Sequence, residues 1–409
     1  MSGRVTILGA GAAGLMAAIT AARAGARVTV IEKTADGGRK ILISGGGRCN
    51  VLPSVAAPER FVSASSPQLV KRLIGSFPLR EQRAFFEEDA GVPLALEEDS
   101  GKLFPKSNRA RDVRDALVRL ATDAGVEFRW STTVTGIARA SGGWRVLVNT
   151  GDAIEAAAVI VATGGLSVPM TGSDGAGLAI AKRLEHAIVP TYPALTPLLS
   201  NHRSHWALSG LSLHATLKAP GSGKHARSTG GFLFTHRGYS GPTVLDVSHA
   251  YTRDRGDVLV SWNNIARPEW ESALEDRTGL VTTRVAARLP SRLAEMLVAT
   301  AGIPPDRKMA ELKRDERASL INTLTDYRLP VTGDEGYKKA EVTGGGVALD
   351  EVDASTLESR RHKGLFFCGE VLDAFGPIGG HNFMWAWSTG RAAGYAAGLA
   401  AGGNVDGKW

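Results

Sequence analysis

The chain opens with a short apolar run, a glycine-rich turn and a second apolar run. RVTIL is followed by GAGAAG, by an alanine-rich stretch that reaches Ala24, and by RVTVI. Short apolar runs bounded by turn residues are typical of buried strands, whereas alanine is the strongest helix former. The pattern therefore predicts a strand, a helix and a second strand at the start of the chain.

The same change from an apolar run to glycine occurs twice more. Residues 159–162 (VIVA) lead into TGG, and residues 364–368 (GLFFC) lead into Gly369 and Glu370. Strands that are buried on both faces form nearly continuous apolar runs in parallel sheets. We therefore expect one α/β domain whose sheet combines segments from both ends of the chain.

The middle of the chain has a different pattern. From about residue 190 to residue 262, alternating segments such as HATLKA and GGFLFTHRGYSGP are separated by proline and glycine turns, which predicts a β-rich region. From residue 268 to residue 326, apolar residues such as Leu289, Leu293 and Leu297 recur every fourth position. Residues four apart lie on one side of a helix, so this spacing predicts a small helical insert.

Composition narrows the class of protein. The chain has 409 residues, of which 43% are hydrophobic and 22% charged, and such values are typical of a globular protein with two or three domains. Apolar stretches are interrupted by glycine, arginine or glutamate before the ~20 residues that a membrane span needs. Two cysteines, Cys49 and Cys368, cannot form a disulfide framework, and we expect a reducing, cytoplasmic location.

The net charge of +7 raises the question of a nucleic-acid partner. The lysines and arginines are dispersed, and no basic block interleaved with aromatic residues is evident in the sequence. A solvated surface, or a field that attracts anionic ligands, explains the charge better. The sequence therefore argues against a nucleic-acid partner.

The first glycine turn has the spacing G-x-G-x-x-G at Gly9, Gly11 and Gly14. Between a strand and a helix, this spacing lets the backbone approach a pyrophosphate, whose charge the helix N-terminus stabilises. Glu32 closes the second strand, where a carboxylate can accept hydrogen bonds from ribose hydroxyls. The combination predicts a dinucleotide site, and Glu32 argues against a 2′-phosphate because two negative charges would repel.

A second glycine-rich region follows closely. It comprises residues 37–40 (GGRK) and residues 44–50 (SGGGRCN). Consecutive glycines let backbone amides surround a ligand, and the arginines and the lysine supply positive charge for phosphates or for a reduced flavin. Cys49 is best interpreted as a small residue packed against the cofactor; a redox-active thiol, activated by Arg48, is the alternative.

A third constellation follows the C-terminal strand. Glu370 comes directly after that strand, and residues 376–383 read GPIGGHNF. The carboxylate can hold a ribityl hydroxyl, while paired glycines and a helix N-terminus can face the pyrimidine edge of an isoalloxazine, which becomes anionic on reduction. His381 is a candidate general acid or base, or a residue that contributes one hydrogen bond.

Together these segments resemble the BaiN/YhiN-like, or aminoacetone-oxidase-like, FAD-binding flavoproteins of the glutathione-reductase-like superfamily. The resemblance is carried by GAGAAGL, GRKILISGGGRCN, VIVATGG, KAEVTGGGV and LFFCGEVLDAFGPIGGHNFMWAWSTG, and it extends nearly end to end. The first and third segments occur in many flavoproteins, whereas SGGGRCN and the C-terminal segment together are specific. We therefore expect FAD as the cofactor, bound noncovalently.

The resemblance implies three parts, in agreement with the changes of pattern along the chain. We expect a discontinuous, Rossmann-like α/β domain that binds FAD, formed by residues 1–188 and 346–409. A β-barrel-like substrate domain, residues 189–264 and 327–345, interrupts it. A small helical domain, residues 265–326, is inserted in turn.

The motifs and the resemblance together predict the residues around FAD, and no metal site is expected. The predicted cofactor-binding residues are Gly9, Gly11, Ala12, Ala13, Gly14, Glu32, Lys33, Arg39, Lys40, Gly46, Gly47, Arg48, Cys49, Asn50, Val134, Ala162, Thr163, Gly164, Gly165, Gly369, Glu370, Gly379, Gly380, Asn382 and Phe383.

The substrate site is expected between the FAD-binding and barrel-like domains. The candidate catalytic residues are His381, Cys49, Arg237 and Tyr239. Arg237 and Tyr239 belong to the THRGYSGP turn, where they could recognise a carboxylate or carbonyl group of a small molecule, or could form an ordinary turn.

The expected activity is that of an FAD-dependent oxidoreductase, in which flavin N5 exchanges a hydride with a small organic substrate. Two reactions stay open: NAD(P)H-linked reduction of an activated C=C bond, and oxidation of a small amine with oxygen as acceptor. Because no second G-x-G-x-x-G unit is present, NAD(P)H would bind only transiently at the flavin or be replaced by another electron donor. A non-catalytic or RNA-associated flavoprotein is the alternative from another class, and the sequence leaves the substrate and the oligomeric state open.

Overall fold

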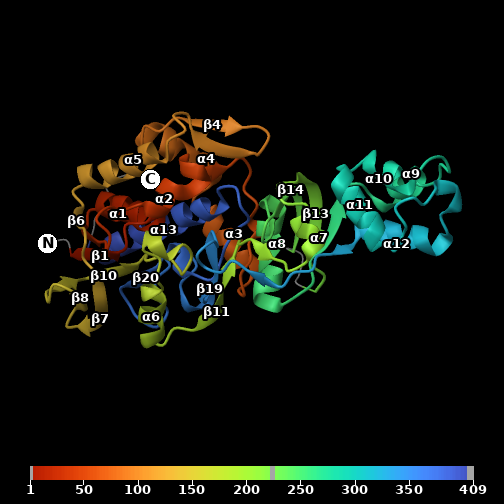
Figure 1. The fold of residues 1–409 in the computed structure, drawn as a ribbon. Helices are drawn as coiled ribbons and strands as arrows, with labels where there is room; N and C mark the ends of the chain where they lie inside the picture. The colour runs from red at the N-terminus through yellow and green to blue at the C-terminus, as the bar shows by residue number, and fades with distance from the viewer. Residues whose placement is uncertain (1–2, 222–225, 403–409) are drawn as a thin grey trace. The chain divides into compact units, whose positions relative to one another are not determined.

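A computed structural model describes residues 3–221 and 226–402 of the chain. The chain forms two compact units, one made of residues 1–191 and 342–409 and the other of residues 192–341. The first unit therefore combines both ends of the chain, which Figure 1 colours red to yellow and blue. The second unit is a single insertion.

A five-stranded parallel sheet forms the centre of the first unit, in the strand order β20-β10-β1-β2-β6. Its strands are β1 (Arg4–Leu8), β2 (Arg27–Ile31), β6 (Glu127–Arg129), β10 (Ala158–Val161) and β20 (Leu365–Phe367). Leu8 lies beside both Ile31 and Val161, and Val161 lies beside Phe367. The three glycine transitions of the sequence thus meet at one edge of one sheet, which confirms a Rossmann-like α/β domain.

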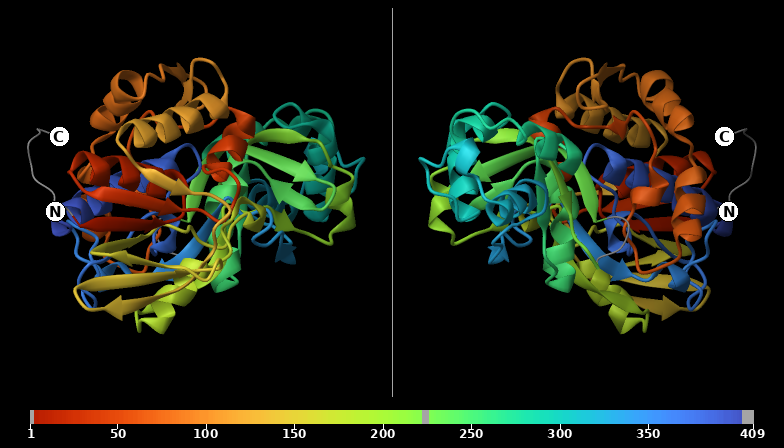
Figure 2. Two further views of the ribbon diagram at one scale, coloured as in Figure 1. Left: turned by 90° about the vertical axis from the view of Figure 1, so that its left-hand side faces the viewer. Right: turned by 90° about the vertical axis from the view of Figure 1, so that its right-hand side faces the viewer.

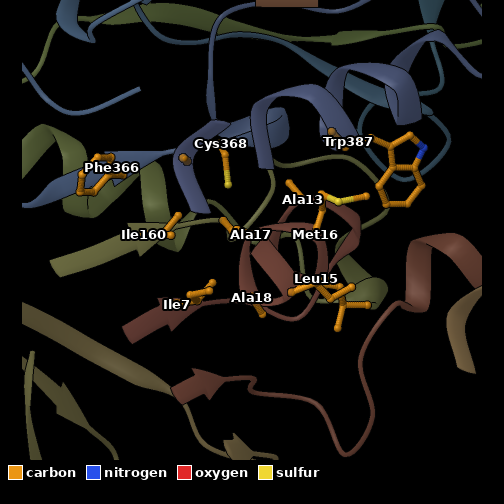
Figure 3. Packing of buried hydrophobic residues seen from close by; sticks show 14 of the residues in the cluster. Ile7, Ala13, Leu15, Met16, Ala17, Ala18, Ile160, Phe366, Cys368 and Trp387 are labelled. Carbon is orange, nitrogen blue, oxygen red and sulfur yellow. The ribbon is translucent and has the colours of Figure 1, made fainter. Parts of the chain in front are cut away.

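Helices α1 (Ala12–Arg23) and α13 (His381–Ala400) pack against each other on one face of this sheet (Figure 1). Their backbones approach closely because α13 has glycine at every fourth position. A Cβ at Gly390 would lie 2.4 Å from Ala13 O, and a Cβ at Gly394 would lie 2.3 Å from Ala17 O. Figure 3 shows Ala17 of α1 in the same core as Ile160 and Cys368.

Smaller elements cover the rest of the first unit. The antiparallel sheet of β7 (Val134–Ala140), β8 (Gly143–Val148) and β9 (Ala153–Ala156) lies on the other face of the parallel sheet, as Figure 2 shows. A second short sheet contains β3 (Leu52–Pro53), β5 (Lys102–Pro105) and β4 (Leu94–Glu97). The remaining principal helices are α2 (Arg39–Ile43), α3 (Pro67–Gly75), α4 (Leu79–Ala84), α5 (Ala110–Asp123) and α6 (Ala176–Arg183).

The second unit contains a seven-stranded antiparallel sheet in the order β17-β16-β13-β14-β15-β12-β18. The strands are β12 (Leu198–Leu199), β13 (Ser212–Lys218), β14 (Arg227–Thr235), β15 (Gly238–Ser240), β16 (Leu259–Trp262), β17 (Tyr327–Arg328) and β18 (Gly333–Asp334). In the described part of the chain, the outer strands β17 and β18 pair only with their inner neighbours β16 and β12 and not with each other. The sheet is open, so the expected barrel-like form is not confirmed.

The described residues of the second unit contain helices at three places, and the short α7 (Arg203–Trp206) lies between β12 and β13. Between β16 and β17 lie α9 (Arg267–Ala273), α10 (Val281–Ala286), α11 (Ser291–Thr300) and α12 (Arg314–Thr325). A further helix, α8 (Pro242–Asp254), lies in the region where the sequence pattern predicted only strands. Pro242 occupies its first turn, and its buried residues Val244, Val247 and Ala250 recur every third position, so a helical period begins where the alternation ends.

The chain enters and leaves the second unit along β11 (Ile188–Ala194) and β19 (Val342–Val347), which form a two-stranded sheet. Across residues 3–221 and 226–402, none of the helices combines the length and the apolar character needed to cross a membrane.

Candidate functional site

The G-x-G-x-x-G turn joins the carboxyl end of β1 to the first turn of α1. A Cβ at Gly14 would lie 2.0 Å from Gly9 O, and a Cβ at Gly9 would lie 2.7 Å from Ala162 O, so both positions need glycine. At Gly11, in contrast, an added Cβ has no atom within 4 Å. The middle glycine therefore faces open space at the start of α1, where the phosphates of a ligand can approach the backbone.

Helix α1 and the carboxylate after β2 offer complementary groups. Within the described ranges no side chain caps α1, whose first amides precede the intrahelical hydrogen bonds and can bind an anion. Glu32 is buried, with Oε2 accepting from Ala10 N at 2.8 Å and Oε1 accepting from Thr34 N at 2.8 Å. Because Oε2 accepts one hydrogen bond here, it can accept a second from a ribose hydroxyl.

A second carboxylate, Glu370, lies just beyond β20 in a dense network. Its Oε2 accepts from Lys40 Nζ at 2.6 Å, and its Oε1 accepts from Ser167 Oγ at 2.5 Å. Thr343 donates twice to Oε1, from its backbone N at 3.0 Å and from Oγ1 at 2.9 Å. The network holds Glu370 in place with four donors from three distant segments, while Oε2 can still accept from a ribityl hydroxyl.

Ser167 and Thr343 were not predicted from the sequence. Thr343 lies within the KAEVTGGGV segment, next to its glycines, and that position was the only signal. Its Oγ1 also accepts from Leu166 N at 2.7 Å and from Ser167 N at 3.1 Å. The hydroxyl of Thr343 thus connects Glu370 to the loop that follows β10.

The loop between β10 and α6 reaches both carboxylates. Ser167, in its first half, bonds Glu370, while a Cβ at Gly172 would lie 3.9 Å from Glu32 Oε1. Lys33 Nζ pairs with Asp174 Oδ2 at 2.6 Å and holds the second half. Val168 has a φ of 48°, a left-handed conformation that a β-branched residue rarely adopts. The loop therefore extends from the predicted ribose site to the predicted ribityl site.

The SGGGRCN segment forms a loop of left-handed glycines. Gly45, Gly46 and Gly47 have φ values of 54°, 67° and 86°, and a Cβ at Gly46 would meet no atom within 4 Å. Arg48 points to the neighbouring sheet, where its guanidinium lies 4.0 Å from the Phe104 ring and pairs with Glu97 at 2.9 Å. The glycines leave open backbone beside the predicted cofactor site that is formed by the turn of residues 9–14, Glu32 and Glu370, which we call the cradle. The charge of Arg48 is already paired.

Asn50 and Asn382 join this loop to the start of α13. In the orientation that satisfies both of its groups, the Asn50 amide donates to Leu52 O at 3.2 Å and accepts from Gly380 N at 3.0 Å. Asn382 accepts from Gly376 N at 2.9 Å and donates to Gly376 O at 3.0 Å. Both amides are therefore used to shape the two loops that meet at Gly380.

The thiol of Cys49 is completely buried below the glycine loop. Burial raises the pKa of Cys49 to about 12, and the hydrogen bond with Ser44 offsets only part of that rise. Burial also raises the pKa of Cys368. Both thiols are protonated at neutral pH, which favours the interpretation of Cys49 as a packing residue.

His381 is the first residue of α13 and is also buried. Burial lowers its pKa to about 4, so the ring is neutral at pH 7. Nδ1 approaches Ile378 O at 3.3 Å, and the Phe61 ring lies edge-on at a centroid distance of 6.3 Å. Nε2 is buried, and none of the residues that the structure describes forms a hydrogen bond of regular geometry with it. A neutral imidazole can donate one hydrogen bond and accept another, but its single N–H is too weak an acid to act as a general acid at pH 7.

Other predicted residues of the first unit have well-defined neighbours. Arg39 pairs with Asp36 at 3.0 Å, and Phe383 stacks on Trp387 at a centroid distance of 5.5 Å. Val134 begins β7 and pairs with Val148. Among the described residues, no three His, Cys, Asp or Glu side chains are grouped closely enough to hold a metal ion.

Arg237 and Tyr239 belong to the second unit. Arg237 pairs with Glu335 at 3.1 Å, and its side chain is 57% exposed. Tyr239 is fully buried, and its hydroxyl lies 2.5 Å from His205 Nδ1, whose Nε2 lies 2.7 Å from the Tyr327 hydroxyl. The expected role of Arg237 and Tyr239 in substrate recognition stays a prediction.

The cradle of the first unit fits FAD. The glycine turn and the uncapped α1 suit a pyrophosphate, Glu32 and Glu370 suit the ribose and ribityl hydroxyls, and the uncapped N-terminus of α13 suits the electron-rich edge of a flavin. The fold and this site define an FAD-dependent oxidoreductase. The chain belongs to the family described as the HI0933-like protein Rossmann domain, whose model matches residues 3–396.

Several relatives are similar over nearly their whole length. The chain is 34% identical to the ribosomal RNA dihydrouridine synthase of Escherichia coli, with 94% of this chain and 96% of the relative covered. It is 31% identical to the 3-dehydro-bile acid delta(4,6)-reductase of Clostridium scindens, with 96% and 98% covered. A flavocytochrome c3 fumarate reductase in an open conformation shares the fold, with a TM-score of 0.51, 18% identity, and 98% of this chain and 78% of that chain covered.

Proposed function

We propose that this flavoenzyme reduces a C=C bond conjugated to a carbonyl group, and that uridine in ribosomal RNA is its substrate. The observation that carries the proposal is the 34% identity to a ribosomal RNA dihydrouridine synthase over 94% of this chain and 96% of the relative. Because the alignment covers nearly the whole length of both sequences, the similarity includes the inserted unit as well as the cofactor domain. This proposal replaces the sequence-based expectation that nucleic acid is not a partner.

The two groups of relatives support a common chemistry. The name of one group specifies reduction of uridine, whose C5=C6 bond is conjugated to the C4 carbonyl. The name of the other specifies a delta(4,6)-reductase of a 3-dehydro bile acid, in which the ring double bonds are conjugated to a carbonyl at position 3. In uridine a hydride is added to the carbon β to the carbonyl and a proton to the α carbon. The C4=C5 bond of the dienone is reduced in the same way, whereas its C6=C7 bond takes the hydride at the δ carbon and the proton at the γ carbon. Reduction of such a bond in a small molecule is therefore the second candidate function.

FAD, when bound and reduced, supplies the hydride for this reaction, and NAD(P)H is the proposed donor that reduces it. The residues of the chain orient the cofactor: Glu32 and Glu370 hold hydroxyl groups, and Lys40 neutralises part of the charge of Glu370. His381 is neutral at pH 7, because burial lowers its pKa to about 4. The ring therefore suits a hydrogen-bonding role, and the proton that the α carbon needs comes from another donor.

An anaerobic turnover experiment tests the proposal. FAD-loaded protein is reduced with NADPH and mixed with ribosomal RNA that lacks dihydrouridine, with a steroid enone, or with a small primary amine as a control. We expect RNA to restore the absorbance band of oxidised flavin, and mass spectrometry of the digested RNA to detect uridine with two added hydrogens. Reoxidation by the enone alone would support the second candidate. Failure of both substrates to reoxidise the flavin would refute reductive chemistry.

A further inference from the structure

One tryptophan of the second unit lies on the surface. Trp206, the last residue of α7 (Arg203–Trp206), is 43% exposed, whereas Trp262 and Trp270 of the same unit are fully buried. Trp206 Nε1 donates to Ser200 O at 2.9 Å. This hydrogen bond holds the indole in one orientation. Part of a large aromatic ring is therefore exposed to solvent in a fixed position, and the Trp206 side chain would lose little conformational entropy when a ligand binds.

Hydrogen bonds bring three segments together near Trp206. The backbone of Ser200 donates to Arg237 O at 2.9 Å, which brings the turn between β14 and β15 next to the start of α7. Arg292, near the start of α11, donates from Nη1 to Ala207 O at 3.0 Å. The exposed residues of this region, which we call the Trp206 surface, are His202, Arg203, Trp206, His236, Arg237 and Arg292.

The Trp206 surface is basic. Arg203 and Arg292 have no carboxylate within ion-pair distance among the described residues, and the only carboxylate paired within the surface is that of Glu335, which contacts Arg237 at 3.1 Å. An isolated exposed arginine is ordinary, but three arginines and two histidines on adjoining segments that also carry an oriented, exposed indole form a combination that matches an anionic polymer with aromatic groups.

We propose that the Trp206 surface binds single-stranded RNA, with a base stacked on Trp206 and phosphates contacted by Arg203 and Arg292. Single-stranded nucleic acids bind proteins through aromatic platforms combined with cationic side chains, and arginine adds cation–π and planar contacts. In duplex RNA the bases are stacked on each other and cannot cover an exposed indole, so the single strand fits better. The inference rests on the proposed RNA substrate and specifies the part of the second unit that would hold it.

Binding of a fluorescein-labelled single-stranded oligouridylate, measured by anisotropy at several salt concentrations, tests the inference. We expect Trp206→Ala to weaken binding about ten-fold at every salt concentration, because base–aromatic stacking depends little on salt. Arg203→Ala should reduce the slope of log affinity against log salt by about 0.7, the change expected for one lost phosphate contact on a single strand. Arg277→Ala, which removes an exposed arginine elsewhere in the second unit, serves as the matched control and should change neither quantity.

The outcomes separate this inference from the proposed function. Each variant is used as the FAD-loaded protein, and its flavin content and melting temperature must equal those of the wild type. If the wild type binds the oligouridylate but Trp206→Ala and Arg203→Ala bind as Arg277→Ala does, or if the wild type does not bind at all, the Trp206 surface is not an RNA site. Dihydrouridine formation by the wild type would still support the proposed function in that case. RNA binding through Trp206 without dihydrouridine formation would support the surface and refute the function.

Discussion

In the FAD-binding unit the buried Glu32 and the partly buried Glu370 lie directly after strands, next to backbone that faces open space. In the inserted unit the buried His205 instead contacts two phenols, Tyr239 and Tyr327, at distances of 2.5 and 2.7 Å. Both regions contain polar groups that are almost inaccessible to water. In the first region the hydrogen-bonding capacity is only partly used within the protein, whereas in the second region the side chains satisfy one another.

This difference shows that burial of a polar residue does not by itself identify a ligand site. A buried polar group is costly unless it is hydrogen-bonded, so a folded protein pairs it either internally or with a ligand. Tyr239 was a candidate substrate residue because it lies in a glycine-rich turn, and its contacts within the core supply a structural reason for a tyrosine there. The cradle of the first unit is recognised by carboxylate oxygens whose hydrogen-bonding capacity is only partly used and by backbone that faces open space.

The largest expected effect concerns the glycines of the first turn. Gly14→Ala places a Cβ 2.0 Å from Gly9 O, and the resulting shift of the backbone should cost ~3 kcal/mol or more, weakening FAD binding at least a hundred-fold. Gly11→Ala has free space in the protein itself. Its apoprotein should melt as the wild type does, but its affinity for FAD, measured by flavin fluorescence, should fall because the Cβ occupies the open space.

Gly75→Ala is the control for these two variants, because Gly75 ends α3 and an added Cβ there has no atom within 4 Å. It should bind FAD with wild-type affinity. Wild-type affinity in Gly11→Ala would show that the open space beside Gly11 is not used by the cofactor.

A fall in pH should destabilise the protein through the buried His205 of the second unit. Burial lowers the pKa of His205 to about 4, whereas in the unfolded chain a histidine titrates near ~6.5. The unfolded state therefore gains a proton that the native state does not bind as the pH falls from about 6.5 to about 4, and the free energy of unfolding should decrease by up to ~3 kcal/mol over that range. Above pH ~6.5 His205 is neutral in both the native and the unfolded state, and this loss of stability is absent.

Urea unfolding of the wild type, of His205→Gln and of His236→Gln between pH 7 and pH 4.5 measures this contribution. His205→Gln should reduce the pH dependence by this amount, while the part that comes from the buried His381 remains. His236→Gln, which changes an exposed histidine, should retain the full pH dependence. Equal slopes for His205→Gln and the wild type would mean that His205 is already charged in the native core.

A smaller effect is expected from the hydroxyl of Thr343, which joins Glu370 to the loop after β10. Thr343→Val leaves Leu166 N and Ser167 N without their acceptor and removes one donor from Glu370. Each lost hydrogen bond of this kind is worth about 1 kcal/mol, and we expect the affinity for FAD to fall about ten-fold, as measured by calorimetric titration. Thr343→Ser keeps the hydroxyl and should restore most of the affinity.

Thr216→Val in β13 is the control in the second unit, where the hydroxyl faces Thr229 on the exposed side of the sheet. Its FAD affinity should be unchanged. A Thr343→Ser variant that binds FAD as poorly as Thr343→Val would indicate a packing role for the methyl group rather than positioning by the hydroxyl.

The smallest effect is expected at the two cysteines, which should not react in the native protein. Burial raises the pKa of Cys49 to about 12 and also raises that of Cys368, so neither thiol should react with iodoacetamide at pH 8 in the native protein. Mass spectrometry should detect alkylation at both positions only after unfolding in urea. Alkylation of native Cys49 would favour the redox-active alternative.

Much of the cofactor domain could be predicted because its signals are local. Buried strands that end in glycine, and an acid placed directly after a strand, are spaced by the geometry of single elements. Ser167 and Thr343 could not be found in this way, because the hydrogen bond from Ser167 N to Thr343 Oγ1 joins residues 176 positions apart. Helix α8 was missed for a different reason, since its three-residue period begins directly after a strand–turn pattern.

The sequence by itself determined the dinucleotide turn, the parallel strands and the carboxylates that follow two of them, because these features depend on local spacing and on the backbone freedom of glycine. The tertiary structure alone decided which polar side chains complete the cradle, and which buried residues, such as Tyr239, are satisfied within the core. Hydrogen bonds between distant segments depend on strand order and packing, and no spacing along the chain encodes them. The same holds for the Trp206 surface, whose arginines come from three separate segments that only the folded sheet and helices bring together.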